Sequence, residues 1–376
     1  MKQTKLLLLI LAIVMPIMAN ADPVEIDGIY YNLVSKVKTA EVTRDPSISE
    51  YSGSYSCEIV IPDKVTYEGI EYSVTSIGDN AFKYYGLISV TIPNSVTSIG
   101  RYAFYECNSL TSVTIPNGVT SIGEHAFACC SYLTSVTIPN SVNFIDAGAF
   151  FSCSSLTSVT IPNSVTTIDV STFLDCSSLT SVTIPNSVTS IEMYAFKGCS
   201  GLTSVTIGNG VIYISSSAFE GCSGLTSVTI PNSVINLDSD AFNGCSGLTS
   251  ITIGSEVRTI RENAFKGCPE LADVYCMAEN VPDTSSDAFE GSYIEYATLH
   301  VPYGCIDAYK AAEPWTNFKN IVEDGGTGID IIKEDVVSEP FDVYDMSGRR
   351  VLSRVTSIES LPQGIYIVEG KKILKK

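Results

Sequence analysis

Histidine, tryptophan and basic residues are scarce in this chain, and each shortage excludes a class of function. The 376 residues include two histidines, one tryptophan and 22 lysines and arginines, against 41 acidic residues. Neither His125 nor His300 is accompanied by a serine or cysteine at motif spacing, and no phosphate-cradling glycine motif is present. A net charge of −19 excludes nucleic acid as a general electrostatic partner. We therefore expect neither an enzyme nor a bound cofactor.

Long apolar runs are confined to the N-terminus. Lys2 and Lys5 precede an apolar run over residues 6–18, which ends at Ala19-Asn20-Ala21. This pattern predicts a secretory signal cleaved after Ala21, and the run is short for a membrane span. We expect an exported protein with no membrane insertion after cleavage.

A repeat of 23 residues fills most of the chain and decides its fold class. Its leading leucine recurs at Leu87, Leu110, Leu133, Leu156, Leu179, Leu202, Leu225, Leu248 and Leu271. The phenylalanine that closes each unit stands at Phe82, Phe104, Phe127, Phe150, Phe173, Phe196, Phe219, Phe242, Phe265 and Phe289. So regular a repeat predicts a stack of equivalent coils.

Each repeat predicts a strand, a bend and a second inward segment. Apolar and hydroxyl residues alternate over residues 112–115, which is typical of a strand with one wet face. Pro116 ends the strand, and Asn117-Gly118 suits a bend in the left-handed region. Residues 119–122 point two more apolar side chains inward, and residues 123–130 suit a short helical or irregular turn.

One coil cannot bury its own apolar side, but stacked coils can. Parallel strands about 4.8 Å apart in ten coils would build a rod of roughly 50 Å. The pattern LxxVxIPxxVxxIxxxAFxxC over about residues 55–323 resembles the 23-residue class of BspA-like leucine-rich repeats. That resemblance implies a right-handed solenoid, no catalytic residues, and attachment to host or bacterial surface molecules.

Departures from the pattern are local. Thr172 replaces the usual alanine, Gly208 and Gly254 replace the proline, and residues 274–277 blur the final strand. We predict a β-rich repeat solenoid, a rod of about ten coils with parallel strands. A polar lid is expected at each end, because an open strand edge would template aggregation.

The chain divides into six segments. We assign residues 1–21 to the signal peptide, 22–73 to an N-terminal cap with a first irregular coil, 74–290 to the solenoid, 291–323 to a C-terminal cap, 324–328 to a linker, and 329–376 to a small antiparallel β domain.

The C-terminal segment differs in character from the repeats. Its motifs VYDMSGRRV and LPQGIYIVEG and its basic terminus resemble the C-terminal sorting domain of type IX secretion substrates. The resemblance implies carriage across the outer membrane, with removal or surface anchoring afterwards. A plain β-rich tail is the alternative.

Eight cysteines occupy one position of the repeat, so we expect them to form a column inside the rod. Neighbouring thiols would come close enough for a disulfide, but their parallel Cβ vectors do not meet its dihedral requirement. We favour a ladder of buried thiols over pairing, and no histidine or carboxylate interleaves to form a metal site. The ladder comprises Cys107, Cys130, Cys153, Cys176, Cys199, Cys222, Cys245 and Cys268.

Two kinds of surface remain as candidate binding sites. The outward strand positions form uniform columns of serine and threonine, which suit a repetitive ligand or serve only solubility. The residues before each Ala-Phe pair vary from copy to copy and could confer selectivity. The candidates are Thr114, Thr137, Thr160 and Thr183 in the first group, and Arg101, Tyr102, His125, Tyr194 and Arg261 in the second.

These features and the resemblance favour a secreted or surface-displayed, adhesin-like protein of a Gram-negative bacterium. We expect a monomer that binds an extracellular protein or glycan without catalysis. A structural spacer or coat component with no dedicated ligand is the main alternative, and a binder of ice or crystalline polysaccharide is a third.

Overall fold

The computed structural model describes residues 22–47, 57–324, 329–330, 341–345, 350–355, 364–368 and 371–375. The expected signal peptide and nearly all of the expected linker lie outside these residues. Among the described residues, no helix is both long and apolar enough to cross a membrane.

An N-terminal cap begins the rod. Its first three strands form an antiparallel meander, and β5 and β6 form a hairpin that turns between Tyr67 and Ile70. Strand β3 then pairs parallel with β6, so the cap passes directly into the solenoid ladder. The strands are β1 (Val24–Ile26), β2 (Ile29–Val34), β3 (Thr39–Thr43), β4 (Cys57–Val60), β5 (Lys64–Tyr67) and β6 (Ile70–Ile77).

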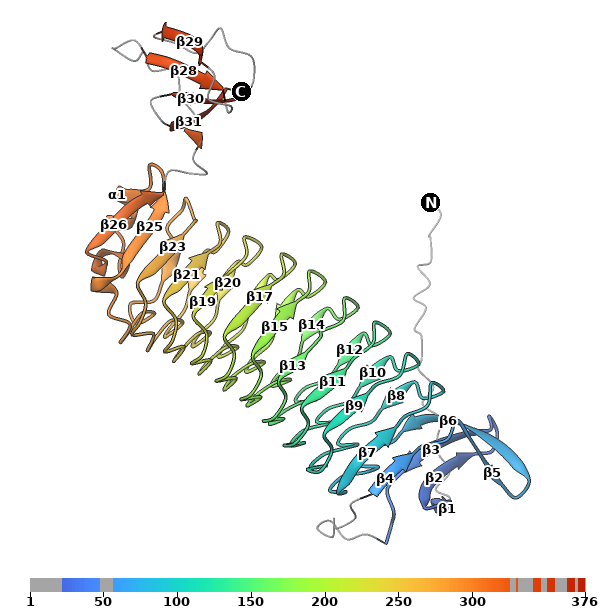
Figure 1. Cartoon of the computed structure of the whole chain (residues 1–376). Coiled ribbons are helices and arrows are strands. Elements are labelled where there is room, and N and C mark those ends of the chain that lie inside the picture. The colour runs from blue at the N-terminus through green and yellow to red at the C-terminus, as the bar shows by residue number, and fades with distance from the viewer. Residues whose placement is uncertain are drawn as a thin grey trace, which may run out of the picture.

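The repeats form a parallel β-solenoid of about eleven turns, which confirms the predicted fold class. Each coil contributes one strand of two to five residues to a first column of the rod and a two-residue strand to a second column (Figure 1). The first column contains β7 (Leu87–Thr91), β9 (Ser112–Thr114), β11 (Ser135–Thr137), β13 (Ser158–Val159), β15 (Ser181–Ile184), β17 (Ser204–Ile207), β19 (Ser227–Thr229), β21 (Ser250–Ile253) and β23 (Asp273–Cys276).

Register in both columns follows the repeat without slippage. Ser135 faces Ser112 on one side and Ser158 on the other, so equivalent residues stack along the rod. The second column contains β8 (Ser98–Ile99), β10 (Ser121–Ile122), β12 (Phe144–Ile145), β14 (Thr167–Ile168), β16 (Ser190–Ile191), β18 (Tyr213–Ile214), β20 (Asn236–Leu237), β22 (Thr259–Ile260) and β24 (Asp283–Thr284).

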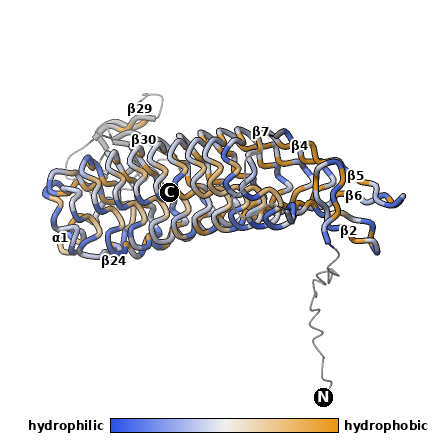
Figure 2. Tube along the Cα trace, turned by 90° about the horizontal axis from the view of Figure 1, so that it is seen from below, coloured by the Kyte–Doolittle hydropathy of each residue, from blue (hydrophilic) through white to orange (hydrophobic). Residues whose placement is uncertain are grey.

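The core is a lattice of identical inward side chains. Leucine, valine, isoleucine, alanine, phenylalanine and cysteine of successive coils are buried, and the apolar residues recur in each coil along the tube of Figure 2. The closing phenylalanines form a continuous stack from Phe82 to Phe289, with neighbouring ring centroids 5.0–5.6 Å apart. Fully burying one such ring stabilises the fold by about 1.5–3 kcal/mol.

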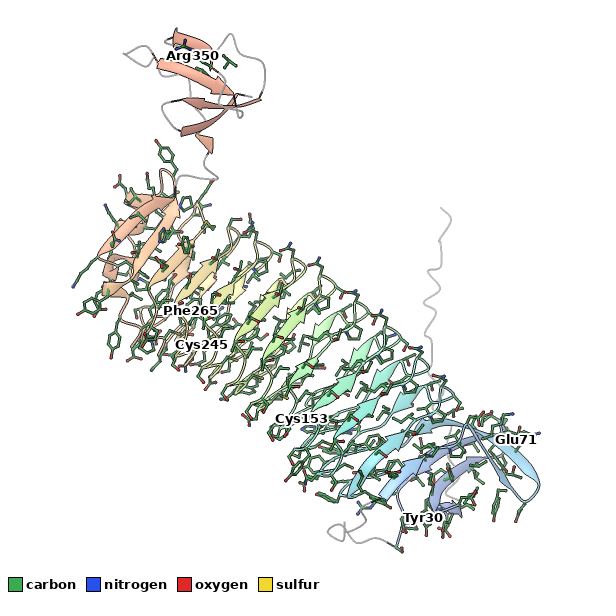
Figure 3. The ribbon with its side chains drawn as sticks, viewed as in Figure 1. Tyr30, Glu71, Cys153, Cys245, Phe265 and Arg350 are labelled. Carbon is green, nitrogen blue, oxygen red and sulfur yellow. The ribbon has the colours of Figure 1, made fainter. Side chains whose placement is uncertain are left out.

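The cysteine ladder is buried as predicted, and its thiols also make hydrogen bonds. Seven of its members, from Cys130 to Cys268, are free thiols. Each ladder thiol donates to a phenylalanine carbonyl of an earlier coil, as Cys153 does to Phe127 at 3.1 Å. Figure 3 labels two of the buried ladder cysteines, Cys153 and Cys245, and one of the stacked phenylalanines, Phe265. The thiols are therefore hydrogen-bond donors as well as small apolar fillers.

The bend after each strand does not use the left-handed region, so that prediction is wrong. Asn117 and Gly118 have ordinary negative φ, and a Cβ on Gly118 would lie 2.1 Å from the carbonyl oxygen of Asn94. Left-handed residues instead flank the phenylalanine, two positions before it and two after it. In one coil these are His125 at φ 54° and Cys129 at φ 60°.

A C-terminal cap closes the rod, and the strand before it is regular. We expected residues 274–277 to be blurred, but Ile253 pairs with Cys276 in full register. The cap places Trp315, which is fully buried, edge-on to Phe289 at 5.6 Å. Its elements are η1 (Ile294–Tyr296), β25 (Thr298–Pro302), α1 (Ile306–Lys310), η2 (Trp315–Asn317) and β26 (Asn320–Asp324).

Beyond the cap, the described residues of the tail form paired strands. Strand β28 pairs antiparallel with β29 and β30, β30 pairs antiparallel with β31, and β27 pairs parallel with β31. Val343 of β28 is buried. The strands are β27 (Ile329–Asp330), β28 (Phe341–Asp345), β29 (Arg350–Val355), β30 (Gly364–Val368) and β31 (Lys371–Lys375).

Candidate binding surfaces

The first candidate surface is the outward side of the first strand column, which we call the hydroxyl face. It carries Thr114, Thr137, Thr160 and Thr183, all exposed, beside the equivalent serines. The four threonines line two adjoining hollows that share Thr160. The remaining lining is serine, threonine, asparagine, proline, glycine and aliphatic residues, so neither hollow carries a charge that would attract an ionic ligand.

The hydroxyl face changes character at its C-terminal end. There Tyr275 and His300 stack with ring centroids 4.1 Å apart, and the Nε2 atom of His300 lies 3.1 Å from a carboxylate oxygen of Asp273. Within the described residues, no group of three or more histidine, cysteine or acidic side chains is arranged to hold a metal ion.

The second candidate surface is the edge of the rod that the turns around each Ala-Phe pair form. Tyr102, His125 and Tyr194 all occupy the left-handed position two residues before the phenylalanine. Their backbone N–H groups donate to the next coil, with Tyr102 bonded to the Glu124 carbonyl at 2.9 Å. The backbone of this edge is thus constant, while its side chains vary.

Six side chains gather on this edge in the first four coils, and we call them the aromatic edge patch. Tyr102 stacks on His125 with centroids 5.1 Å apart and meets Tyr105 edge-on at 5.5 Å. Tyr105 meets Tyr84 edge-on at 5.6 Å, and His125 meets Phe151 at 6.1 Å. The patch consists of Lys83, Tyr84, Tyr102, Tyr105, His125 and Phe151.

Lys83 holds the centre of the patch. Its Nζ atom lies 5.0 Å from the ring centroid of Tyr84, 5.1 Å from that of Tyr102 and 5.2 Å from that of Tyr105. A cation over an aromatic face is attracted by the ring quadrupole, by about 0.5–1 kcal/mol per exposed contact. Burial and the neighbouring Cys129 raise the pKa of the Tyr105 hydroxyl, so it stays protonated at neutral pH.

Charged neighbours border the patch. Arg101 forms an ion pair with Glu124, whose other carboxylate oxygen lies 3.6 Å from the Nδ1 atom of His125. His125 is half-buried rather than outward in solvent, because its ring covers Gly148. A Cβ at that glycine would lie 2.7 Å from the Nε2 atom of His125. Gly148 therefore makes room for the stacked imidazole.

The structure brings together only some of the predicted edge residues. Tyr102 and His125 stack, and Arg101 is joined to His125 through Glu124, whereas Tyr194 and Arg261 lie on later coils. Tyr194 carries Lys197 over its ring at 5.1 Å, and a nitrogen of Arg261 lies 3.3 Å from a carboxylate oxygen of Asp238. These later contacts are separate and do not extend the aromatic patch.

Sequence reasoning missed Lys83, Tyr84, Tyr105 and Phe151. All four follow the closing phenylalanine, whereas the prediction considered only the residues before it. The signal was present in the repeat itself. Later copies carry Gly198, Gly221 and further glycines at the position of Tyr84, so an aligned column would have shown that tyrosine as a departure. The other three stand directly after the phenylalanine, where the residue varies from copy to copy.

Known proteins place this chain within a family of repeats. The model of the BspA type leucine-rich repeat region matches residues 75–203 and 189–309. No curated protein matches the chain in sequence.

Solved structures show similar repeats. A leucine-rich cell-surface protein of Faecalibacterium prausnitzii is 30% identical, with 81% of this chain and 95% of that chain covered and a TM-score of 0.47. A leucine-rich repeat protein of Bacteroides ovatus is 23% identical over 80% of this chain and 100% of its own, with a TM-score of 0.48. A leucine-rich repeat protein of T. pallidum is 26% identical over 64% of this chain and 86% of its own, with a TM-score of 0.37. Because the family model covers more than half of the sequence, this chain belongs to the BspA-type leucine-rich repeat family.

Proposed function

We propose that this chain is an exported, adhesin-like protein that binds an extracellular protein or glycan without chemical turnover. The observation that carries the proposal is the aromatic edge patch, where three tyrosine rings surround Lys83 and His125 stacks on one of them. Binding energy at interfaces concentrates in aromatic and arginine side chains held in fixed positions. The patch, with Arg101 beside it, supplies this kind of surface.

The contrast between the repeated inward residues and the variable edge residues supports this proposal. Inward residues repeat almost unchanged because each must pack on its copies in the coils above and below. Edge residues have no such constraint, and their backbone is held rigid by hydrogen bonds to the next coil. A rigid scaffold that displays variable side chains suits recognition.

The proposal includes export and a sorting role for the tail. The apolar segment within residues 1–21 would direct secretion, and residues 329–376 would carry the chain to the cell surface or the medium. The pairing of β28 with β29 and β30 supports a folded tail. Deleting residues 329–376 should leave the protein in the periplasm, whereas equal export of both forms would contradict the sorting role.

An edge variant tests the binding function. We would replace Arg101→Ala, Tyr102→Asn, Tyr194→Asn and Arg261→Ala. Asparagine is chosen because Asn80 and Asn263 occupy the same left-handed position in other coils. On arrays of glycans and of extracellular matrix proteins, the wild type should retain a defined ligand, and this edge variant should lose it.

A matched face variant separates the two surfaces. Thr137→Tyr, Thr160→Tyr and Thr183→Tyr would fill the hollows of the hydroxyl face and leave the edge unchanged. Binding that survives the edge variant but fails in the face variant would assign recognition to the hydroxyl face. A wild type that retains nothing from either array would favour a spacer with no dedicated ligand.

A further inference from the structure

We infer that the aromatic edge patch binds an acidic segment of a protein partner, and that Lys83 is the cation its carboxylates reach. This inference rests on the proposed function and gives the chemistry of the partner for that site. It depends on a comparison among equivalent lysines of the repeat.

Three lysines directly follow the closing phenylalanine of their coils. Lys197 is paired with Glu220 of the next coil at 2.8 Å, and Lys266 is paired with Glu290 of its next coil at 2.5 Å. In both cases the glutamate follows the phenylalanine of its own coil. A lysine at this position is thus neutralised by a glutamate at the same position of the next coil.

Lys83 has no such glutamate in the next coil. The residue at the glutamate position of its next coil is Tyr105, and none of the described carboxylate oxygens lies within the 4.0 Å ion-pair distance of the Lys83 Nζ atom. The place that Glu220 occupies beside Lys197 is taken here by an aromatic ring. A partner carboxylate would supply the missing negative charge.

The three tyrosine rings hold the ammonium group but do not satisfy it. A ring face attracts a cation without accepting a strong hydrogen bond, and an ammonium group has three N–H donors. Those donors stay available to a carboxylate, with which a charge-assisted hydrogen bond is short and strong. Because the rings already fix the lysine, less side-chain entropy is lost on binding.

The ring arrangement favours a polypeptide over a sugar. Lys83 lies over one face of each of the three tyrosine rings, and His125 stacks on Tyr102 as well. A pyranose needs an open ring face on which to stack. The ring of Tyr102 already contacts the ammonium group of Lys83 and the imidazole of His125. Because these contacts already occupy the ring of Tyr102, a carboxylate of a polypeptide at Lys83 suits the patch better than a stacked sugar ring.

The acidic character of the whole chain sets the conditions for a test. A net charge of −19 repels an acidic partner at long range. At about 0.15 M salt the Debye length is about 8 Å, so distant charges are screened and the contact with Lys83 decides the outcome. Binding should therefore be measured at that ionic strength.

The experiment uses the full chain and an array of short synthetic acidic peptides that each contain an aromatic residue. Matched peptides with Asn and Gln for Asp and Glu, and sialylated oligosaccharides, complete the array. The wild type should retain acidic peptides over their neutral partners. Lys83→Ala and Tyr105→Glu should each weaken that retention about tenfold. Tyr105→Glu recreates the arrangement of Lys197 and Glu220, so it should occupy Lys83 from within the chain.

Lys197→Ala is the matched control, since it removes a lysine at the same position of another coil and should leave retention unchanged. Melting curves of all variants would identify any that unfold. Equal retention of acidic peptides by folded Lys83→Ala and wild type, or no preference for acidic peptides, would overturn the inference. If the chain retains only the oligosaccharides, and does so through Lys83, the assignment of the partner as a polypeptide would be wrong. In either case, loss of another ligand by the edge variant would leave the proposed function standing.

Discussion

At the scale of single residues, the thiol ladder makes stability sensitive to high pH. Burial raises the pKa of Cys130, Cys199 and Cys268 to about 12, and raises that of Cys153 and Cys176 well above the ordinary 9.0. A thiol whose folded pKa is raised stabilises the fold fully below its unfolded pKa, and this contribution is lost as pH rises through the folded value.

The predicted consequence is alkaline unfolding that depends on the number of ladder thiols. Between about pH 9 and 12, each buried thiol should lower the free energy of unfolding by about 1.4 kcal/mol per pH unit. Replacing Cys153→Ala and Cys176→Ala should make the free energy of unfolding fall less steeply with pH. The small cavities left by the two substitutions should lower that free energy already at pH 7. Urea unfolding at a series of pH values is the measurement. Parallel pH dependences of wild type and variant would contradict the assignment of buried, protonated thiols.

The sequence predicted where the thiols lie but not the carbonyl groups to which they donate hydrogen bonds. A shared repeat position predicts that Cys130 and Cys153 stack, and the chemistry of disulfides argues against their pairing. The S–H bond to a phenylalanine carbonyl depends on how the turn orients that carbonyl, which no spacing encodes. Likewise, the left-handed φ of Tyr102 and His125 became visible only in the folded turn.

At the scale of the element, one coil is the unit of folding and of change. Equivalent strands pair in register, as Val182 with Val205 and Ile184 with Ile207, so each coil presents the same surface to both neighbours. Stability in such an array is roughly a sum over coils and their interfaces. The coil was predictable because its period is written in the sequence many times. The aromatic edge patch was predicted only in part, through Tyr102 and His125, because contacts such as Lys83 over Tyr102 join different positions of different coils.

Excision of one whole coil should therefore be tolerated. Deleting residues 156–178 removes one period of 23 residues and brings Leu179 to the place of Leu156. The shortened rod should keep its β-sheet circular dichroism and melt cooperatively at a modestly lower temperature. Deleting residues 156–167 alone is the control, and it should unfold the rod because it breaks the register. Similar melting of both deletions would contradict the coil as the unit.

At the scale of the whole molecule, the caps decide whether the open ends of the lattice stay covered. Trp315 packs against Phe289, Tyr309 and Phe318, with ring centroids 5.3–6.0 Å apart. Without this cover, the end of the phenylalanine stack and the last strands would meet water and invite edge-to-edge association.

Trp315→Ala should lower the free energy of unfolding by about 3–5 kcal/mol and promote aggregation. Thermal melting followed by light scattering measures both effects. Tyr303→Ala is a suitable control, because that side chain in the same cap is 74% exposed. Equal melting and scattering of the two variants would show that the tryptophan does not seal the rod.

The central claim is that the inward lattice holds the fold, which leaves the edge free for recognition. Thermal unfolding of the edge variant beside Phe173→Ala tests this claim most directly. Phe173 is fully buried between Phe150 and Phe196, so its truncation should cost about 3–5 kcal/mol and lower the melting temperature clearly. The edge variant, which loses only exposed or half-buried contacts, should melt close to the wild type. An edge variant that melts as low as Phe173→Ala would contradict the claim.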